Sequence, residues 1–385
     1  MINLKSPRST MMLVFAGFGA VVGAWAGSIP QIMAAAGIDS YNLGIGITAS
    51  SLATVIAMSA GGKLGKMFSN RAMLLVAIPL LALVTMFLLT SGSAWFFFAS
   101  LTGFGAVLGL TDVFMNAEAS AIEHDARRPI FTAFHASASL SLAAFAIASS
   151  FLTATRSTAA TGLVVVASLV LAWLMVYCFV PARKLTPGKS SSVAILSSRL
   201  PLIIMGLATG LSISAETAAT LWSAKLLNEQ APSLAAIAGL GAAFYGICNA
   251  AVRFMGDALR SHFGEIPLML FSLLLAMAGF TTLGLSTSFT LSVVAFAAVG
   301  FGLSILCPCL FNMAAAQVPA NRAAGLSFIS TVAGLPRILA PWVFGWIATI
   351  YSTSFAFGLC TVVLAVAFGL IMNLRSLIKV RADNS

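Results

Sequence analysis

Long apolar stretches separated by short polar segments follow one another along the whole chain. A helix needs about 20 consecutive apolar residues to span the hydrocarbon core of a bilayer, and these stretches reach that length. The pattern predicts spans near residues 11–33, 42–62, 72–91, 95–119, 132–154, 159–180, 200–226, 235–258, 267–286, 290–314, 325–349 and 354–375. The stretches lack the two-residue alternation of barrel strands, so we expect an all-α membrane protein with twelve transmembrane helices.

Composition excludes a soluble protein. Of 385 residues, 60% are hydrophobic and 8% are charged, too few charges to cover a soluble surface of this size. The net charge of +10 comes from residues between the apolar runs rather than from a basic patch, so we expect no nucleic-acid partner. We also expect no cofactor and no metal, because the cysteines all lie inside apolar runs: Cys178, Cys248, Cys307, Cys309 and Cys360.

Basic residues mark the cytoplasmic side of a membrane protein. Sixteen of the 20 Lys and Arg residues fall in one set of loops and at the two termini, whereas the opposite set holds Arg156, with Lys225 at its edge. Both termini are therefore predicted to be cytoplasmic. Lys5 and Arg8 precede the stretch 11–33, which is too long for a signal peptide and is expected to be an uncleaved first span.

The two halves of the chain repeat similar features on either side of a polar loop, residues 181–199. We expect a first bundle at 1–180, a cytoplasmic linker at 181–199 and a second bundle at 200–385. The repeated features are Gly103-Phe104-Gly105 with Gly300-Phe301-Gly302, Arg128 and Phe134 with Arg322 and Phe328, and the Gly62 to Phe68 segment with Gly256 to Phe263. Their common spacing predicts a parallel duplication of six helices plus six.

This organisation resembles the major facilitator superfamily. The loop from Gly62 to Arg71 is similar to the family's Gly-x-Leu-x-Asp-Arg-x-Gly-Arg-Arg motif, with Lys66 where the family has Asp. The resemblance implies two six-helix bundles related by a pseudo-two-fold axis along the membrane normal, acting as a monomer by alternating access. It also implies a conformational role for the residues of this loop and its second-half counterpart: Gly62, Arg71, Arg253, Gly256 and Asp257.

A narrower resemblance is to the bacterial YbjJ-type inner-membrane proteins, which implies an inner-membrane location. Leu221 stands where that branch has an acidic residue, and Arg337 stands where it tends to have an apolar one. The segments that carry the resemblance are Gly23-Ala24-Trp25-Ala26 with Ile29-Pro30, Asp112 to Asn116, Glu123 with Arg128-Pro129, Phe134-His135-Ala136, and Ala215-Glu216 with Trp222-Ser223.

Arg337 and Glu216 are ionisable residues inside predicted spans. A charge at the bilayer centre costs at least about 2.5–3.5 kcal/mol, so such residues are functional candidates. Both lie roughly 22–25 Å from the cytoplasmic ends of their spans, and we expect them to pair. The pair either holds two helices together or binds substrate, with Arg337 meeting an anionic group and Glu216 responding to it or to a proton. Pro336 and Pro341 flank the arginine and permit kinks there.

A second polar pair is predicted in the first half. Asp112 and His135 lie on consecutive spans, and a carboxylate beside an imidazole in a low dielectric suits proton coupling. A packed, hydrogen-bonded histidine with a capping aspartate is the alternative. Asn116, one turn from Asp112, is expected to extend the same polar face and contribute to substrate binding. Glu118 is expected to snorkel to water.

Two tryptophans and a cysteine pair complete the candidates. Trp25 and Trp222 either line the cavity and stack on a ligand or pack between helices. Cys307-Pro308-Cys309 has the form of a membrane Cu(I) site, but a proline kink between two small residues is favoured, because neither a nucleotide-binding domain nor a Met-x-x-x-Met pair accompanies it.

These features predict a secondary active transporter of a small organic solute, an anion or zwitterion, coupled to protons across the lipid bilayer. An exporter of cationic drugs or metabolites is the alternative substrate class. Two other classes stay open: a non-transporting receptor on the same scaffold, and an intramembrane enzyme, for which the acid and base groups lack a nucleophile. ATP-driven pumping is excluded, since no Walker motif is present.

Overall fold

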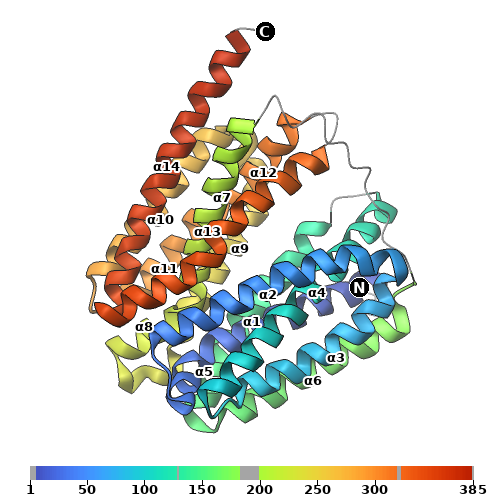
Figure 1. Ribbon diagram of the computed structural model, residues 1–385, viewed down its shortest axis with the longest axis vertical. Helices are drawn as coiled ribbons and strands as arrows, with labels where there is room; N and C mark the ends of the chain where they lie inside the picture. The colour runs from blue at the N-terminus through green and yellow to red at the C-terminus, as the bar shows by residue number, and fades with distance from the viewer. Residues whose placement is uncertain (1–5, 128–129, 183–198, 319–321, 384–385) are drawn as a thin grey trace.

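The computed structural model describes residues 6–127, 130–182, 199–318 and 322–383, and the side chains of 132, 199, 257, 322–324 and 375–383 lie outside that description. The described residues are helical almost throughout (Figure 1). The elements are α1 (Pro7–Ala36), α2 (Ser40–Met67), α3 (Asn70–Leu89), α4 (Ala94–Ala126), α5 (Phe131–Thr155), α6 (Thr158–Phe179), α7 (Arg199–Leu221), α8 (Ser223–Gln230), η2 (Pro232–Ile237), α9 (Leu240–Phe263), α10 (Glu265–Leu285), α11 (Phe289–Leu303), α12 (Leu306–Gln317), α13 (Arg322–Ile350) and α14 (Thr353–Asp383).

The described residues contain 12 helical segments long and apolar enough to cross a membrane, as the hydropathy pattern predicts. The chain is therefore a multi-pass, all-α membrane protein. The predicted linker lies outside the described residues except at its ends. The same holds for Arg128 and for the side chain of Arg322, which belong to one of the repeated features.

Local capping explains the sharp turns between spans. In the turn between α1 and α2, Gly37 adopts a left-handed conformation with φ of 65° and ends α1. Two residues later the Asp39 carboxylate accepts a hydrogen bond from the Asn42 backbone N–H at 2.8 Å and begins α2. Ser69, Ser157 and Ser288 cap α3, α6 and α11 in the same way. These side chains satisfy amide donors that a helix start would leave unpaired.

Two predicted spans are interrupted. The predicted span at 200–226 divides at Trp222 into α7 and α8, and the predicted span at 290–314 divides at 304–305 into α11 and α12. Pro308 explains the second break, because a proline has no N–H to donate to the carbonyl four residues earlier. That carbonyl belongs to Ser304, and it accepts a hydrogen bond from Nε of Arg253 at 3.5 Å instead.

The helices form two bundles with the same internal contacts, as a six-plus-six duplication requires. In the first bundle α1 packs on α5 and α6, α2 on α4, and α3 on α6; in the second, α7 packs on α13 and α14, α9 on α11, and α10 on α14. Figure 1 shows α1 to α6 at lower right and most of α7 to α14 at upper left. The architecture is that of two six-helix bundles, as the resemblance to the major facilitator superfamily implies.

Close-packed small residues hold the helices within each bundle together. Gly19, Gly23 and Gly27 form a stripe along α1 that lies against the backbone of α5, so a Cβ on any of them would collide with Ala138, Leu142 or Ala146. In the second bundle Gly206 and Gly210 of α7 lie against α13 in the same way. Small residues allow such close approach, and dispersion contacts then replace the missing hydrophobic driving force between helices in lipid.

The two bundles touch along α2 with α13 and along α5 with α9, and α1 and α5 also contact α8 and η2. The tightest of these contacts lie near the α1–α2 turn and η2. A Cβ added to Gly44 of α2 would stand 2.5 Å from the Pro341 carbonyl oxygen of α13, and one added to Gly239 would collide with Ala146 of α5. The bundles are therefore closed at this end, opposite the termini, and they diverge toward the other end (Figure 1).

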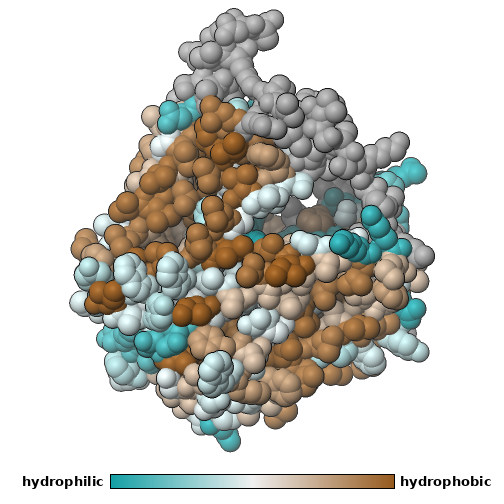
Figure 2. Space-filling model, in the orientation of Figure 1, coloured by the Kyte–Doolittle hydropathy of each residue, from teal (hydrophilic) through white to brown (hydrophobic). Residues whose placement is uncertain are grey.

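The apolar side chains follow this arrangement. A continuous core fills each bundle, with residues such as Phe15, Phe97 and Phe114 in the first and Phe280, Phe296 and Phe357 in the second fully buried. Other large apolar side chains are exposed on the outside, where lipid would cover them, and Figure 2 shows broad hydrophobic areas over both bundles with a hollow between them.

Candidate functional site

A cavity of about 430 Å³ lies between the bundles, and it is the natural candidate for a binding site. Its volume falls within the range of small-molecule sites, roughly 300–1,000 Å³. The first bundle contributes α5, and the second contributes α9, α12 and Ile305. The lining residues are Phe131, His135, Ala136, Ser139, Ala250, Arg253, Phe254, Gly256, Arg260, Ile305, Cys307, Pro308 and Phe311.

Arg253 connects this cavity to a cluster of polar side chains, which we call the Glu216 cluster: Glu216 of α7 with Tyr245, Asn249 and Arg253 of α9. Glu216 Oε1 lies 3.4 Å from Nη2 of Arg253 and accepts a hydrogen bond from Asn249 Nδ2 at 3.3 Å. Asn249 Nδ2 also lies 3.3 Å from the Tyr245 hydroxyl. The three α9 residues are spaced by four, which places them on one face of the helix.

The predicted Glu216–Arg337 pair is wrong. Among the described residues Glu216 forms its ion pair with Arg253, and the carboxylate whose charge acts on Arg337 is that of Asp112. The reason is geometric: α7 and α13 are neighbours, but α9 brings an arginine to Glu216. Asp112 belongs to the first bundle, so the charges of Arg337 and Asp112 act on each other between the bundles, although no hydrogen bond or ion pair joins these two side chains among the described residues.

The predicted Asp112–His135 pair is also wrong. Asp112 Oδ1 accepts a hydrogen bond from Asn116 Nδ2 at 2.9 Å, which confirms that these two residues share a polar face. His135 lies against the rings of Phe15 and Phe131, at centroid distances of 5.1 and 5.0 Å. Its nearby charge is Arg253 of the other bundle. Consecutive helices α4 and α5 make few contacts with each other, because α4 packs on α2 and α3, whereas α5 packs on α1 and on α9 of the second bundle.

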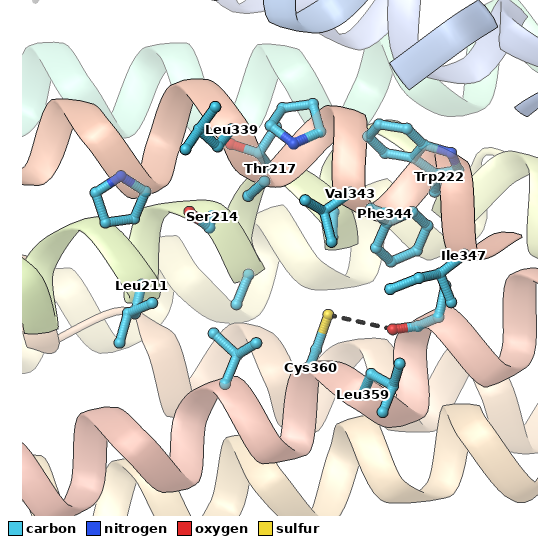
Figure 3. Close-up of a pocket in the computed structure, with 17 residues that line it drawn as sticks. Leu211, Ser214, Thr217, Trp222, Leu339, Val343, Phe344, Ile347, Leu359 and Cys360 are labelled. Atoms are coloured by element: carbon cyan, nitrogen blue, oxygen red, sulfur yellow. Dashed lines mark hydrogen bonds between the residues drawn. The ribbon is translucent and has the colours of Figure 1, made fainter. Parts of the chain in front are cut away.

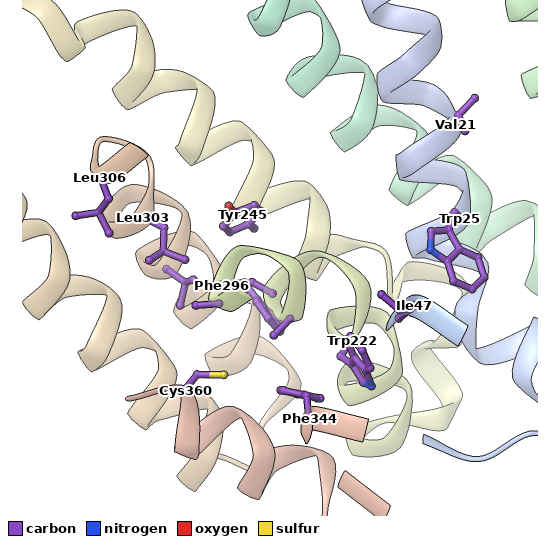
Figure 4. Packing of buried hydrophobic residues seen from close by; sticks show 14 of the residues in the cluster. Val21, Trp25, Ile47, Trp222, Tyr245, Phe296, Leu303, Leu306, Phe344 and Cys360 are labelled. Atoms are coloured by element: carbon purple, nitrogen blue, oxygen red, sulfur yellow. The ribbon is translucent and has the colours of Figure 1, made fainter. Parts of the chain in front are cut away.

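Both candidate tryptophans are buried in this conformation, on different bundles (Figure 4). Trp25 packs on Phe97 at a centroid distance of 6.0 Å, and Trp222 packs on Phe344 at 4.7 Å. Trp222 also lines a second cavity of about 250 Å³ between α7, α13 and α14, whose walls are mostly apolar (Figure 3). In this conformation both indoles therefore pack between helices. A role of either ring in stacking on a ligand stays a prediction.

The residues of the predicted conformational loops divide into different settings. Arg71 anchors the start of α3 to the end of α6, because its Nη2 donates to the Tyr177 carbonyl at 2.7 Å and its guanidinium lies over the Tyr177 ring. Gly62 faces open space. Gly256, like Arg253, lines the central cavity. The side chain of Asp257 lies outside the described residues.

Glu118 does not snorkel, contrary to the prediction. The residue is fully buried, and its Oε2 accepts a hydrogen bond from Asn70 Nδ2 at 3.0 Å. Asn70 is the first residue of α3 and lies near the end of the loop from Gly62 to Arg71. A carboxylate within the first bundle therefore holds the end of this loop.

Two members of the Glu216 cluster, Tyr245 and Asn249, were not predicted from the sequence. Tyr245, Asn249 and the Ser304 carbonyl carry no charge, so they are not among the intramembrane ionisable groups that the sequence reveals. A signal was present: Tyr245, Asn249 and Arg253 recur every four residues in an otherwise apolar span, the pattern of a polar helix face. Arg253 itself was assigned to a loop motif, although the charge lies inside a span.

Comparisons with known proteins agree with this architecture. Residues 202–383 match the family model of the Major Facilitator Superfamily. The chain is 26% identical over 335 residues to the membrane protein MosC of Rhizobium meliloti, covering 86% of this chain and 81% of MosC. It is 27% identical over 363 residues to an uncharacterized MFS-type transporter of Yersinia pestis, covering 92% of each. These matches support the major facilitator superfamily.

Solved structures show the same fold. The nucleoside transporter NupG superposes with a TM-score of 0.77 at 13% sequence identity, over 97% of this chain and 99% of NupG. A bacterial homologue of the human lysosomal transporter Spinster, in an inward-facing and occupied conformation, superposes with a TM-score of 0.78 at 12% identity over 96% of each chain. At these identities the likeness extends to the fold alone.

Proposed function

We propose that this chain is a secondary active transporter of the major facilitator superfamily, of the YbjJ-type branch, that moves a small organic anion or zwitterion across a bacterial inner membrane. The cavity between the bundles carries the proposal: it is large enough for a metabolite, it is built from both bundles, and basic side chains line it. A site shared by two bundles changes its access when the bundles rock about it, which is the basis of alternating access.

The arrangement of the bundles supports the same proposal. They are closed at the end opposite the termini by backbone contacts such as Gly44 with Pro341. With both termini cytoplasmic, as the distribution of Lys and Arg predicts, this conformation is open toward the cytoplasm. We assign Asp112 and Arg337, whose charges act on each other between the bundles, to the coupling of substrate to protons, with His135 and Glu216 as further proton sites and Asn116 as a polar contact for substrate.

Reconstituted protein tests the proposal. Liposomes containing the purified protein should accumulate organic anions from a metabolite set, and an imposed pH gradient should change the rate of uptake. A non-transporting receptor would bind members of the set without uptake under either condition, and an exporter of cations would move organic cations instead. Either outcome would replace the proposed function. Empty liposomes are the control.

A further inference from the structure

Arg253 is incompletely paired for a guanidinium inside a membrane protein. Arginine carries five N–H donors, and the described residues provide two acceptors: the Ser304 carbonyl, 3.5 Å from Nε, and Glu216 Oε1, 3.4 Å from Nη2. Charge-assisted N–H···O hydrogen bonds in proteins are normally about 2.7–2.9 Å long. Both contacts of Arg253 are longer than this, so the guanidinium retains donors for another acceptor.

These donors face the cavity between the bundles. Arg253 lines the cavity, and 35% of its side chain is exposed. No acidic residue is among the described residues that line the cavity. The other arginine of the lining, Arg260, is held by Glu265 at 3.1 Å. Arg253 is therefore the cation available to an anionic group that enters from the open side.

The break between α11 and α12 orients the guanidinium. The Ser304 carbonyl receives no helix hydrogen bond from residue 308, because Pro308 has no N–H. It is therefore free to accept a hydrogen bond from Nε of Arg253. This contact holds one edge of the guanidinium against α11, and the opposite edge, with the two Nη atoms, is left for Glu216 and the cavity. Pro308 also lines the cavity, so the break serves both its shape and the position of the arginine.

Glu216 shows which ligand chemistry suits the position. A side-chain carboxylate already lies at the edge of the guanidinium, with a long single contact rather than the two short parallel bonds that arginine and carboxylate prefer. A free carboxylate arriving through the cavity could adopt the two-bond geometry. Phe131, Phe254 and Phe311 on the cavity wall would contact an apolar body attached to such a carboxylate.

We propose that Arg253 binds the carboxylate of the substrate and that Glu216 is the group the substrate displaces. Arg253 then acts as a binding residue rather than only as a residue of a conformational loop. The cavity takes a small organic carboxylate with an apolar or aromatic body. The inference rests on the proposed transport function, because only a transported ligand is a substrate. Binding at this site can nevertheless be measured without transport.

The test measures binding to detergent-purified protein by thermal shift, with a set of monocarboxylates from acetate to benzoate and phenylacetate, and with benzamide and phenylacetamide as uncharged counterparts. At least one carboxylate should stabilise the wild type saturably, and its amide should not. Arg253→Gln should weaken that binding about tenfold or more, because a charge-assisted contact is lost. Glu216→Gln should strengthen it several-fold, because the competing charge is removed.

Two further variants keep the test decisive. Arg253→Lys keeps the positive charge but loses the planar guanidinium that can form two parallel hydrogen bonds. Its affinity for the carboxylate should lie between those of the wild type and Arg253→Gln. Arg156→Gln, which removes the charge of an exposed arginine outside the cavity, is the matched control, and it should bind as the wild type does. Size-exclusion profiles report whether each variant is folded. Binding that survives Arg253→Gln, or a full set of carboxylates that stabilises neither wild type nor Glu216→Gln, would overturn the assignment.

The failure of this site and the failure of the transport proposal give different results. If carboxylates bind through Arg253 but liposomes show no uptake of any member of the set, the site stands and the transport function fails. If liposomes take up an organic anion and Arg253→Gln transports it at the wild-type rate and half-saturation, transport stands and the assignment of Arg253 fails.

Discussion

The contact between Gly44 and Pro341 provides a sharp test of alternating access. It joins α2 of one bundle to α13 of the other near the closed end, where a Cβ on residue 44 would stand 2.5 Å from the Pro341 carbonyl oxygen. Ordinary van der Waals contact for a Cβ begins at 3.4 Å. The oxygen belongs to helix backbone and cannot rotate away, so Gly44→Ala forces the two bundles apart at this end.

The expected magnitude follows from where the clash acts. Overpacking of this kind costs about 1–3 kcal/mol, and the cost falls on the conformation in which α2 and α13 touch. The gain in helix propensity from alanine applies in both conformations and cancels. Since each 1.4 kcal/mol is a factor of ten, the substitution should shift the equilibrium by a factor of about 5 to about 140 toward the conformation open at this end.

Double electron–electron resonance can report the separation of the bundles. The spin labels are attached at Asp39→Cys and Ser352→Cys, both exposed residues near this contact, in a Cys178→Ser background. Gly44→Ala should add or enlarge a longer-distance population. Gly334→Ala on α13 is the matched control, because its added Cβ meets nothing within 4 Å. An unchanged distance distribution in Gly44→Ala, or an equal change in Gly334→Ala, would refute the reasoning.

Three other substitutions test separate parts of the site. Arg337→Ala should abolish transport while the protein remains folded by size exclusion, and unimpaired uptake would remove Arg337 from the mechanism. Asp112→Asn should weaken the dependence of uptake on pH, measured between inside-acid and inside-alkaline liposomes; unchanged dependence would move the coupling to Glu216 or His135. Glu118→Ala should lower the free energy of unfolding by about 1–3 kcal/mol, because it leaves Asn70 buried without this acceptor. The exposed Glu229→Ala is its control in a thermal melt, and equal melting temperatures for the two variants would contradict the role of Glu118.

The apolar pattern was sufficient to predict the fold. Twelve runs of membrane-spanning length must become helices, because a bilayer offers no partner for free backbone groups, and the structure contains those spans. The break at Trp222 was not predicted, whereas the proline kink expected at Pro308 corresponds to the break between α11 and α12. The stripe of Gly19, Gly23 and Gly27 was also present in the sequence as a pattern of every fourth residue, and it specifies the packing of α1 on α5.

The pairing of the charges was not predictable in the same way. Sequence spacing gives the depth of Glu216, Asp112 and Arg337 in the membrane, because rise along a helix is fixed at about 1.5 Å per residue. It does not give the direction in which each helix face points. Both predicted pairs joined residues of one bundle, whereas in the structure Glu216 pairs with Arg253, and His135 lines the same cavity as Arg253 across the interface.

The sequence by itself therefore determined that this protein spans a membrane twelve times, that its halves repeat, and which ionisable residues lie inside the bilayer, since length, hydropathy and charge act locally along the chain. Only the tertiary structure decided which of those charges meet. Rotation of each helix about its axis depends on packing against several neighbours at once, and that rotation places Arg253, rather than Arg337, between Glu216 and the cavity.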